Sequence, residues 1–124
     1  MMTDMTMDNF LAVLSSSEPV PGGGGACGYV AAVGMSLGNM VLALTTGKKK
    51  YAEYQEEIEE LIVKATDLTK RLAECMDKDA ESFKPLAAAY GLPKDTEEQI
   101  KEREAIMAKA LVTASEAPLS MMEL

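Results

Sequence analysis

Histidine and tryptophan are absent from the 124 residues, and aromatic side chains make up only 5% of them. Without histidine the chain has no imidazole to act as a general base, a metal ligand or a member of a catalytic triad. Any proton transfer must therefore use carboxylates, lysines, tyrosines or backbone groups.

Positive charge is also scarce, with 12 basic against 20 acidic side chains and a net charge of −8. This is the wrong sign for a surface that neutralises nucleic-acid phosphates, so no nucleic-acid partner is expected. Cys27 and Cys75 are not spaced as a CxxC pair, and the chain has no histidine to join them as a metal ligand, so no metal site is predicted. We expect both to be small core residues in a reducing compartment. No basic residue precedes Lys48, so the charged start of a secretory signal is missing and a cytoplasmic location is predicted.

No charged side chain occurs between Ala26 and Thr46, a run long enough to invite comparison with a membrane span. The run is rich in Gly, Ala and Ser, contains Asn39, and lacks flanking aromatic belts. We therefore predict a helix buried on all sides in a soluble bundle, with no membrane partner. Gly34 and Gly38, spaced four apart, would let another helix approach closely.

Alternating strand patterns are absent, and the length fits one domain, so the sequence predicts an all-α fold over residues 1–124. A first helix is expected over Asp4–Ser15, followed by a Pro- and Gly-rich loop over residues 18–25. Thr96 begins a capping box that predicts a helix to about Ser115. Pro118 suits the first turn of a further helix.

After Gly47, a predicted helix end, the segment Tyr51–Tyr90 indicates one long helix or a helix kinked near Pro85. Its apolar residues recur at steps of three and four, the spacing of a helix packed along its length. They are Tyr51, Tyr54, Ile58, Leu61, Ala65, Leu68, Leu72 and Cys75. Asp79 falls on the same stripe, which resumes at Phe83 and Leu86.

A carboxylate on an inward-facing stripe is costly unless it is paired, hydrogen-bonded or protonated. Buried acids of this kind gather at functional sites, which makes Asp79 the first catalytic candidate. An ion pair with Arg103 of the next helix would explain the same position structurally, and the residues alone leave both explanations open. Asp77 and Glu81 lie off the stripe and are expected to face solvent.

Two further segments carry groups that suit an anionic ligand. Pro21, Gly22, Gly23 and Gly24 lead into a helix, whose first N–H groups can bind a carboxylate or phosphate, although a plain turn has the same composition. Lys48, Lys49 and Lys50 stand together on an otherwise acidic chain. They would attract a polyanionic tail, or simply stabilise the dipole of a helix that ends there.

Four motifs in order resemble one family: Pro21-Gly22-Gly23-Gly24, Gly47-Lys48-Lys49-Lys50-Tyr51, Asp77-x-Asp79-Ala80-x-x-Phe83 and Leu92-Pro93-Lys94-x-Thr96-x-Glu98. The chain is similar over essentially its whole length to the formiminotetrahydrofolate cyclodeaminase and methenyltetrahydrofolate cyclohydrolase family. The resemblance implies long helices, a homodimer or higher homo-oligomer, and a folate held between helices. It implies a tetrahydrofolate derivative as the substrate, and no metal.

The family either closes formiminotetrahydrofolate to methenyltetrahydrofolate with release of ammonia, or interconverts methenyl- and formyl-tetrahydrofolate. The resemblance implies that Asp79 is catalytic, and that the substrate is bound by Pro21, Gly22, Gly23, Gly24, Lys48, Lys49, Lys50 and Asp77. Family members continue for several helices beyond the position of Pro118, so residues 1–124 correspond to the N-terminal part of the usual length. The alternative hypothesis is an inactive, truncated helical homologue that acts as a dimerisation or interaction module.

Overall fold

The computed structural model describes residues 1–124 and contains helices but no strands, which confirms the predicted all-α class. Two short 3₁₀ helices, η1 and η2, accompany four α-helices, α1 to α4. In chain order the elements are η1 (Met2–Asp4), α1 (Met7–Leu14), α2 (Gly23–Thr45), η2 (Lys49–Tyr54), α3 (Gln55–Tyr90) and α4 (Glu97–Met122).

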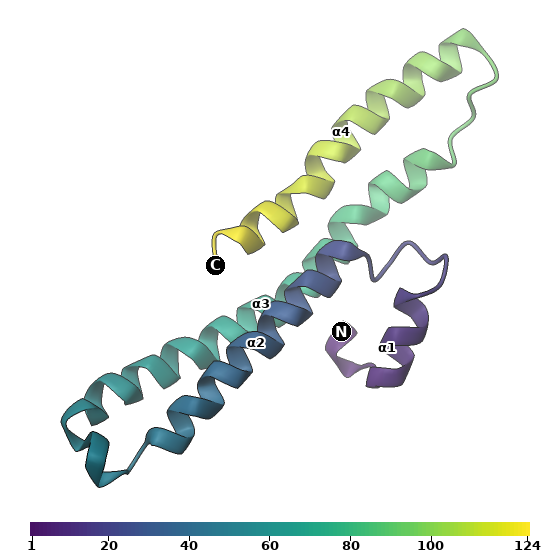
Figure 1. The fold of residues 1–124 in the computed structure, drawn as a ribbon. Helices are drawn as coiled ribbons and strands as arrows, with labels where there is room; N and C mark the ends of the chain where they lie inside the picture. The colour runs from purple at the N-terminus through teal and green to yellow at the C-terminus, as the bar shows by residue number, and fades with distance from the viewer.

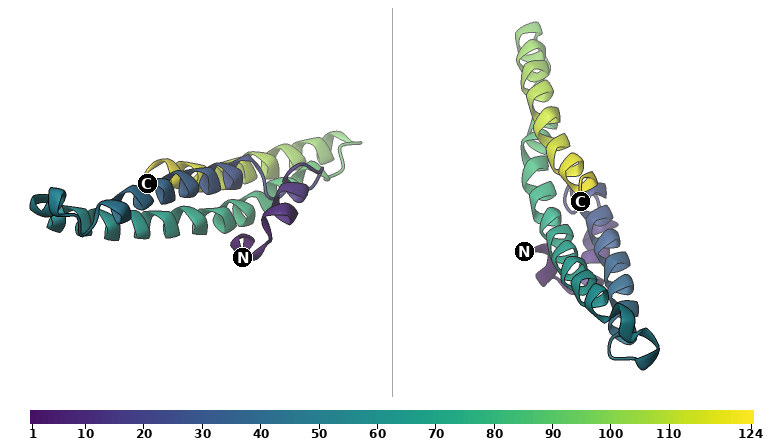
Figure 2. Two further views of the ribbon diagram at one scale, coloured as in Figure 1. Left: turned by 60° about the horizontal axis from the view of Figure 1, so that its bottom comes forward. Right: turned by 90° about the vertical axis from the view of Figure 1, so that its left-hand side faces the viewer.

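The long helix α3 is the spine of the molecule (Figure 1). Helix α2 lies antiparallel along its N-terminal half and α4 lies antiparallel along its C-terminal half, so the start of α2 meets the end of α4 near the middle. The meeting point needs a small residue, because a Cβ at Gly28 would lie 3.0 Å from Cε of Met121 and 3.2 Å from the Leu72 carbonyl oxygen. The result is a long, narrow molecule (Figure 2).

Helix α2 has one buried face and one exposed face, so the prediction of a helix buried on all sides is wrong for this chain. Ala32 faces inward and is 4% exposed, whereas Val30 is 69% exposed. The physical reason is that α4 continues the line of α2 along α3 and does not lie beside it. By length and composition alone α2 is able to cross a membrane, and 11% of that stretch is buried.

The predicted close helix approach at Gly34 is also wrong, since a Cβ built there would have nothing within 4 Å. Gly28, six residues earlier in α2, makes the close approach instead. Gly47 has the positive φ of 77° expected at the end of a helix. This prediction is confirmed.

The predicted long helix is confirmed from Gln55 onward, and it continues through Pro85. Tyr51 and Tyr54 lie before it in η2 and are partly exposed. Further along, most of the predicted stripe forms the core, although Leu61 is 43% exposed and its predicted inward position is wrong. Its buried members are Ile58, Ala65, Leu72, Cys75 and Leu86.

Helix α4 begins as predicted and ends later than predicted. The Thr96 hydroxyl accepts a hydrogen bond from the Gln99 N–H at 3.2 Å, and Oε1 of Gln99 accepts one from the Thr96 N–H at 3.2 Å. The predicted end near Ser115 and the new helix at Pro118 are wrong, because α4 runs on to Met122. Met121 packs against Gly28 of α2, and this packing offsets the hydrogen bond that Pro118 cannot donate.

The N-terminal segment covers the start of α2 and the neighbouring part of α3. The expected helix over Asp4–Ser15 is split into η1 and the shorter α1, which starts after Thr6, whose hydroxyl accepts a hydrogen bond from the Asn9 N–H at 3.1 Å. Phe10 is buried, and its ring centroid lies 5.7 Å from that of Tyr29 on α2. This contact holds α1 against the helix pair.

Candidate functional site

Asp79 lies on the inward face of α3 and is only 8% exposed, as its place on the apolar stripe predicts. Its Oδ2 accepts a hydrogen bond of 2.9 Å from the backbone N–H of Gly25, at the start of α2. The chain offers no hydrogen bond to Oδ1. One oxygen of the carboxylate is therefore fixed by the protein and the other has no partner within it.

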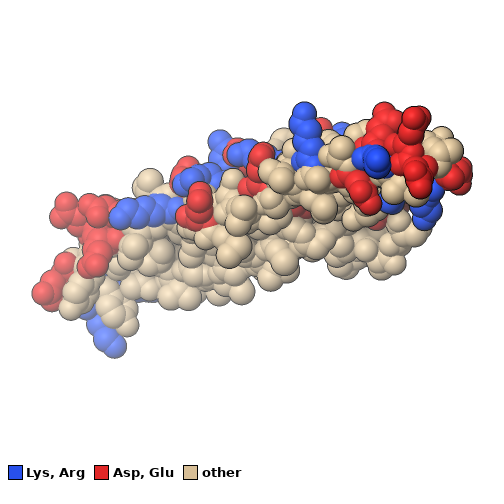
Figure 3. Space-filling view, turned by 90° about the horizontal axis from the view of Figure 1, so that it is seen from above, with Lys and Arg blue, Asp and Glu red and all other residues tan.

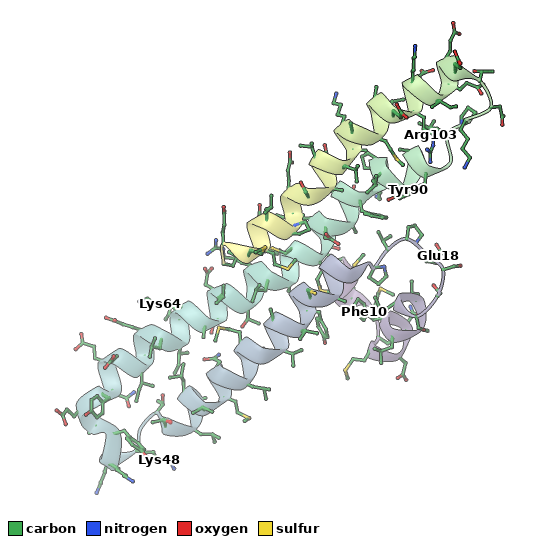
Figure 4. The ribbon with its side chains drawn as sticks, turned by 45° about the horizontal axis from the view of Figure 1, so that its top comes forward. Phe10, Glu18, Lys48, Lys64, Tyr90 and Arg103 are labelled. Atoms are coloured by element: carbon green, nitrogen blue, oxygen red, sulfur yellow. The ribbon has the colours of Figure 1, made fainter.

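Arg103 does not pair with Asp79, so the ion-pair explanation fails. Figure 4 shows Arg103 beside Tyr90, near the turn between α3 and α4. Asp79 lies three turns earlier on α3 and forms no ion pair. The group that compensates the buried carboxylate is a backbone N–H at a helix start, where the helix dipole also favours negative charge.

The glycine run is partly helical, which corrects the predicted loop over residues 18–25. Gly23, Gly24 and Gly25 form the first turn of α2, and the N-cap residue Gly22 has no side chain to bond that turn. The first N–H groups of a helix have no partner within it. Asp79, 54 residues away in the sequence, accepts a hydrogen bond from one of these groups, the Gly25 N–H.

Gly24 gives the carboxylate its space, because a Cβ at this position would overlap the carboxylate of Asp79. Pro21 lies close by, with its Cβ 3.9 Å from a Cβ built on Gly25. A Cβ on Gly23, in contrast, would have nothing within 4 Å. The structure therefore brings Pro21, Gly24 and Asp79 together, and adds Gly25, which the sequence analysis missed although it is the last glycine of the same run.

Asp77 has a different environment from Asp79. Its Oδ1 accepts a hydrogen bond of 2.9 Å from the Met2 N–H, and its Oδ2 is buried without a hydrogen-bond partner. The expectation that Asp77 faces solvent is therefore wrong. Its bond to Met2 ties η1 to α3 just before Asp79.

An apolar cavity of about 220 Å³ lies between the N-terminal segment and the α2–α3 pair. Ten of its 11 lining residues are hydrophobic, among them Phe10, Tyr29 and Met76. Met76 stands one helical turn before Asp79, and the lining residue Ala26 follows Gly25. The cavity suits a flat apolar ring better than a charged group, and the sequence analysis did not foresee it, because its walls come from four separate elements.

The lysine cluster lies far from Asp79 in the same chain. Lys48 is at the tip formed by the end of α2 and η2 (Figure 4), about 30 Å from Gly25 by the rise of the intervening helix. None of Lys48, Lys49 and Lys50 forms an ion pair, and Nζ of Lys50 lies 5.6 Å from the ring centroid of Tyr51. One chain alone does not bring the predicted lysines to the predicted catalytic aspartate.

Comparison with known proteins supports the family resemblance that the four motifs indicate. The methenyltetrahydrofolate cyclohydrolase of Methylorubrum extorquens is 42% identical over 115 residues, which is 93% of this chain and 55% of that protein. The formimidoyltransferase-cyclodeaminases of Dictyostelium discoideum and Mus musculus are 32% and 28% identical over 99% and 97% of this chain, and over 22% of each relative. The chain thus spans about half the length of the first relative and less of the others.

The sequence model of the formiminotransferase-cyclodeaminase family matches residues 6–124. This match covers nearly all of the helices described above, including α2 with its glycine start and α3 with Asp79. The chain belongs to the formiminotransferase-cyclodeaminase family.

Proposed function

We propose that this chain carries the catalytic carboxylate for the hydrolysis of methenyltetrahydrofolate to formyltetrahydrofolate. The choice of reaction is supported by the 42% identity to a protein named as the cyclohydrolase, against 32% and 28% for proteins named as cyclodeaminases. The observation that carries the proposal is the geometry of Asp79. It is a buried carboxylate with one oxygen held by Gly25 and the other without a partner in the chain.

The reaction needs two proton transfers beside the one-carbon unit, which bridges two nitrogens in a cationic substrate. Water adds to this carbon, and a base accepts a proton from that water. One carbon–nitrogen bond then breaks, its electron pair stays on nitrogen, and that nitrogen takes up the proton from the base. The added hydroxyl releases its remaining proton to solvent and becomes the formyl oxygen, so one proton is released overall. In a chain without histidine, Asp79 is the group we assign to both transfers, and such acid/base catalysis contributes about 10²–10⁴-fold to a rate.

The surroundings of Asp79 support one orientation of a bound folate. The apolar cavity beside Met76 would take the aminobenzoyl ring, since ten of its 11 lining residues are hydrophobic. With the ring there, the one-carbon unit next to it in the substrate would lie on the Asp79 side of the cavity.

Asp79→Asn tests the assignment with little structural change. Asparagine keeps an oxygen that accepts the Gly25 N–H, but it does not exchange a proton at neutral pH. We expect kcat for methenyltetrahydrofolate to fall by at least about 100-fold, with the free energy of unfolding changed by less than about 1 kcal/mol. The decay of methenyl absorbance measures the rate, and urea denaturation measures the stability.

Glu81→Gln is the matched control, because Glu81 is an exposed carboxylate two residues away that pairs with Lys84 at 2.7 Å. This variant should retain full turnover. Asp79→Ala should also lose the bond to Gly25 and with it about 0.5–2 kcal/mol of stability. If Asp79→Asn turns over substrate at the wild-type rate, Asp79 is not the catalytic group.

A second candidate is the cyclodeamination of formiminotetrahydrofolate, favoured by the relatives that carry that name. The second folate nitrogen would bond to the formimino carbon and lose its proton to the same carboxylate, which would pass that proton to the departing ammonia. Ammonia release from formiminotetrahydrofolate, measured beside methenyl hydrolysis, decides between the two reactions.

The exposed apolar face of α2 favours a third candidate, a helical interaction module without catalysis. A chain that associates but turns over neither folate would contradict the enzyme proposal and support the module.

A further inference from the structure

The first turn of α2 leaves two backbone donors free beside Asp79. The Gly25 N–H binds the Asp79 carboxylate at 2.9 Å, whereas the N–H groups of Gly23 and Gly24 have no hydrogen-bond partner in the chain. The positive end of the helix dipole lies at the same place. This helix start therefore favours an oxygen atom that carries negative charge.

The Asp79 side chain points at this helix start with one oxygen unpartnered. The residue is 8% exposed, and its Oδ1 is the atom that a Cβ on Gly24 would meet first. Oδ1 accepts no hydrogen bond within the chain, yet solvent still reaches it, unlike the enclosed Oδ2 of Asp77. A nearly buried acceptor needs a donor, and here that donor must come from a bound molecule.

The glycine turn leaves room for such a molecule. A Cβ built on Gly23 meets nothing within 4 Å, so the space beside this residue is open. In the view of Figure 3, basic side chains lie along one long edge of the molecule and at its ends, and none of the basic side chains pairs with Asp79. The polar groups beside the open space are therefore one acceptor, Oδ1 of Asp79, and two backbone donors, the N–H groups of Gly23 and Gly24.

We propose that these three groups hold the reacting oxygen of the hydrolysis. The attacking water donates a hydrogen bond to Oδ1 of Asp79 and accepts hydrogen bonds from the N–H groups of Gly23 and Gly24. The inference rests on the proposed function and adds two main-chain groups to the catalytic carboxylate.

The same groups act in both steps of the reaction. In the first step, Asp79 accepts a proton from the water while the water oxygen bonds to the one-carbon unit. In the second step, the carbon–nitrogen bond breaks with its electron pair on nitrogen, and that nitrogen takes the proton from Asp79. The added hydroxyl loses its own proton to solvent, so negative charge grows on its oxygen. Two preorganised N–H donors stabilise this charge until the atom becomes the formyl oxygen.

Gly23→Pro removes one of the two donors with little change to the fold. Residue 23 is the first of α2, where proline is favoured because its fixed φ suits a helix and its missing N–H has no helical partner. Gly22 already has the extended backbone that a residue before proline prefers, with φ −102° and ψ −171°. A Cβ at position 23 also meets open space.

Gly23→Ala is the matched comparison, because alanine at the same position keeps the N–H. We expect kcat for methenyltetrahydrofolate to be about 100-fold lower in Gly23→Pro than in Gly23→Ala. KM should be the same for both variants, because the oxygen that this N–H holds comes from water and is absent from the substrate. Circular dichroism and urea denaturation should show equal helix content, and stability no lower in Gly23→Pro.

The Gly24 N–H needs a different test, because any Cβ at position 24 overlaps the Asp79 carboxylate. Cys27 allows native chemical ligation of a synthetic peptide of residues 1–26 to residues 27–124, which rebuilds the full chain. Glycolic acid in place of Gly24 exchanges its N–H for an ester oxygen and adds no Cβ. This ester chain should turn over at least about 10-fold more slowly than a chain ligated with glycine at position 24.

Binding measurements separate a role at the oxygen from a general disturbance of the site. Formyltetrahydrofolate contains the oxygen and methenyltetrahydrofolate does not, so the loss of one donor should weaken only the formyl compound. Asp79→Asn is added to both variants to stop turnover. Calorimetric titration should then show formyltetrahydrofolate binding about 2- to 10-fold more weakly to Gly23→Pro than to Gly23→Ala, and methenyltetrahydrofolate binding equally to both.

The outcomes distinguish this inference from the proposed function. Equal kcat in Gly23→Pro and Gly23→Ala, with equal turnover by the ester and amide chains, overturns the oxygen site and leaves Asp79 as the catalytic group. Equal weakening of both folates in Gly23→Pro also overturns it, because the effect is then structural. Full activity of Asp79→Asn overturns the proposed function, while the comparison of proline with alanine still decides whether the helix start holds the oxygen.

Discussion

At the scale of single residues, the site depends on a glycine at position 24, which has no Cβ. The Asp79 carboxylate occupies the space that a Cβ on Gly24 would need, and it is held there by the N–H of the next residue. The acid, the space and the donor come from positions 79, 24 and 25, so no short stretch of sequence contains the arrangement.

Gly24→Ala should therefore disturb the site more than any other glycine change in the run. The added methyl group overlaps the carboxylate, and overpacking of this kind costs about 1–3 kcal/mol. We expect that loss of unfolding free energy in urea denaturation, together with loss of turnover, because Asp79 must move. Gly23→Ala is the control for stability, since its methyl group meets nothing within 4 Å, and equal stability losses in both variants would contradict the explanation.

Sequence alone predicted the burial of Asp79 correctly, because helical periodicity is a local property and the stripe on α3 is regular. It did not predict the partner. Arg103 has the right charge and lies on the neighbouring helix, but it lies several turns away from Asp79, near the α3–α4 turn. Finding Gly25 requires knowing that α2 starts opposite the middle of α3, which is a tertiary fact.

At the scale of elements, the end of α3 at Tyr90 and the start of α4 were predicted correctly, whereas the end of α4 was not. The Thr96 capping box is a local pattern with a defined hydrogen-bond geometry, and it forms as expected. The end of α4 was missed because proline is a local signal that distant contacts override. Pro118 loses one backbone bond, while Met121 beyond it gains packing against Gly28.

Thr96→Ala should destabilise α4 by removing the acceptor for the Gln99 N–H. An N-cap threonine contributes about 1 kcal/mol, so the urea midpoint should fall by the corresponding amount at fixed protein concentration. Lys94→Ala changes an exposed residue of the same turn and should leave the midpoint unchanged. An unchanged midpoint for Thr96→Ala would mean that the first turn of α4 is held by its packing on α3.

At the scale of the whole molecule, the arrangement of α2 and α4 was the least predictable feature. A helix without charged residues has no polar face, so its sequence does not indicate which side packs on α3. The absence of charge on α2 led to a prediction of complete burial, and the structure shows a single buried side. The order of α2 and α4 along α3 follows from the chain connections, because α2 precedes α3, α4 follows it, and each lies along the nearer half of this 36-residue helix.

This arrangement predicts an uneven distribution of local stability. The start of α2, the end of α4 and the N-terminal segment all meet α3 around Leu72–Ala80, where Leu72, Cys75, Met76, Asp79 and Ala80 are buried. Local opening costs most where such contacts converge. Native-state hydrogen exchange should therefore be about 100-fold slower for amides of residues 72–80 than for those of η2 and of residues 88–96. Comparison with the same peptides in denaturant corrects for intrinsic exchange rates, and uniform protection along all of α3 would show that the helix opens as one unit and is not anchored at its middle.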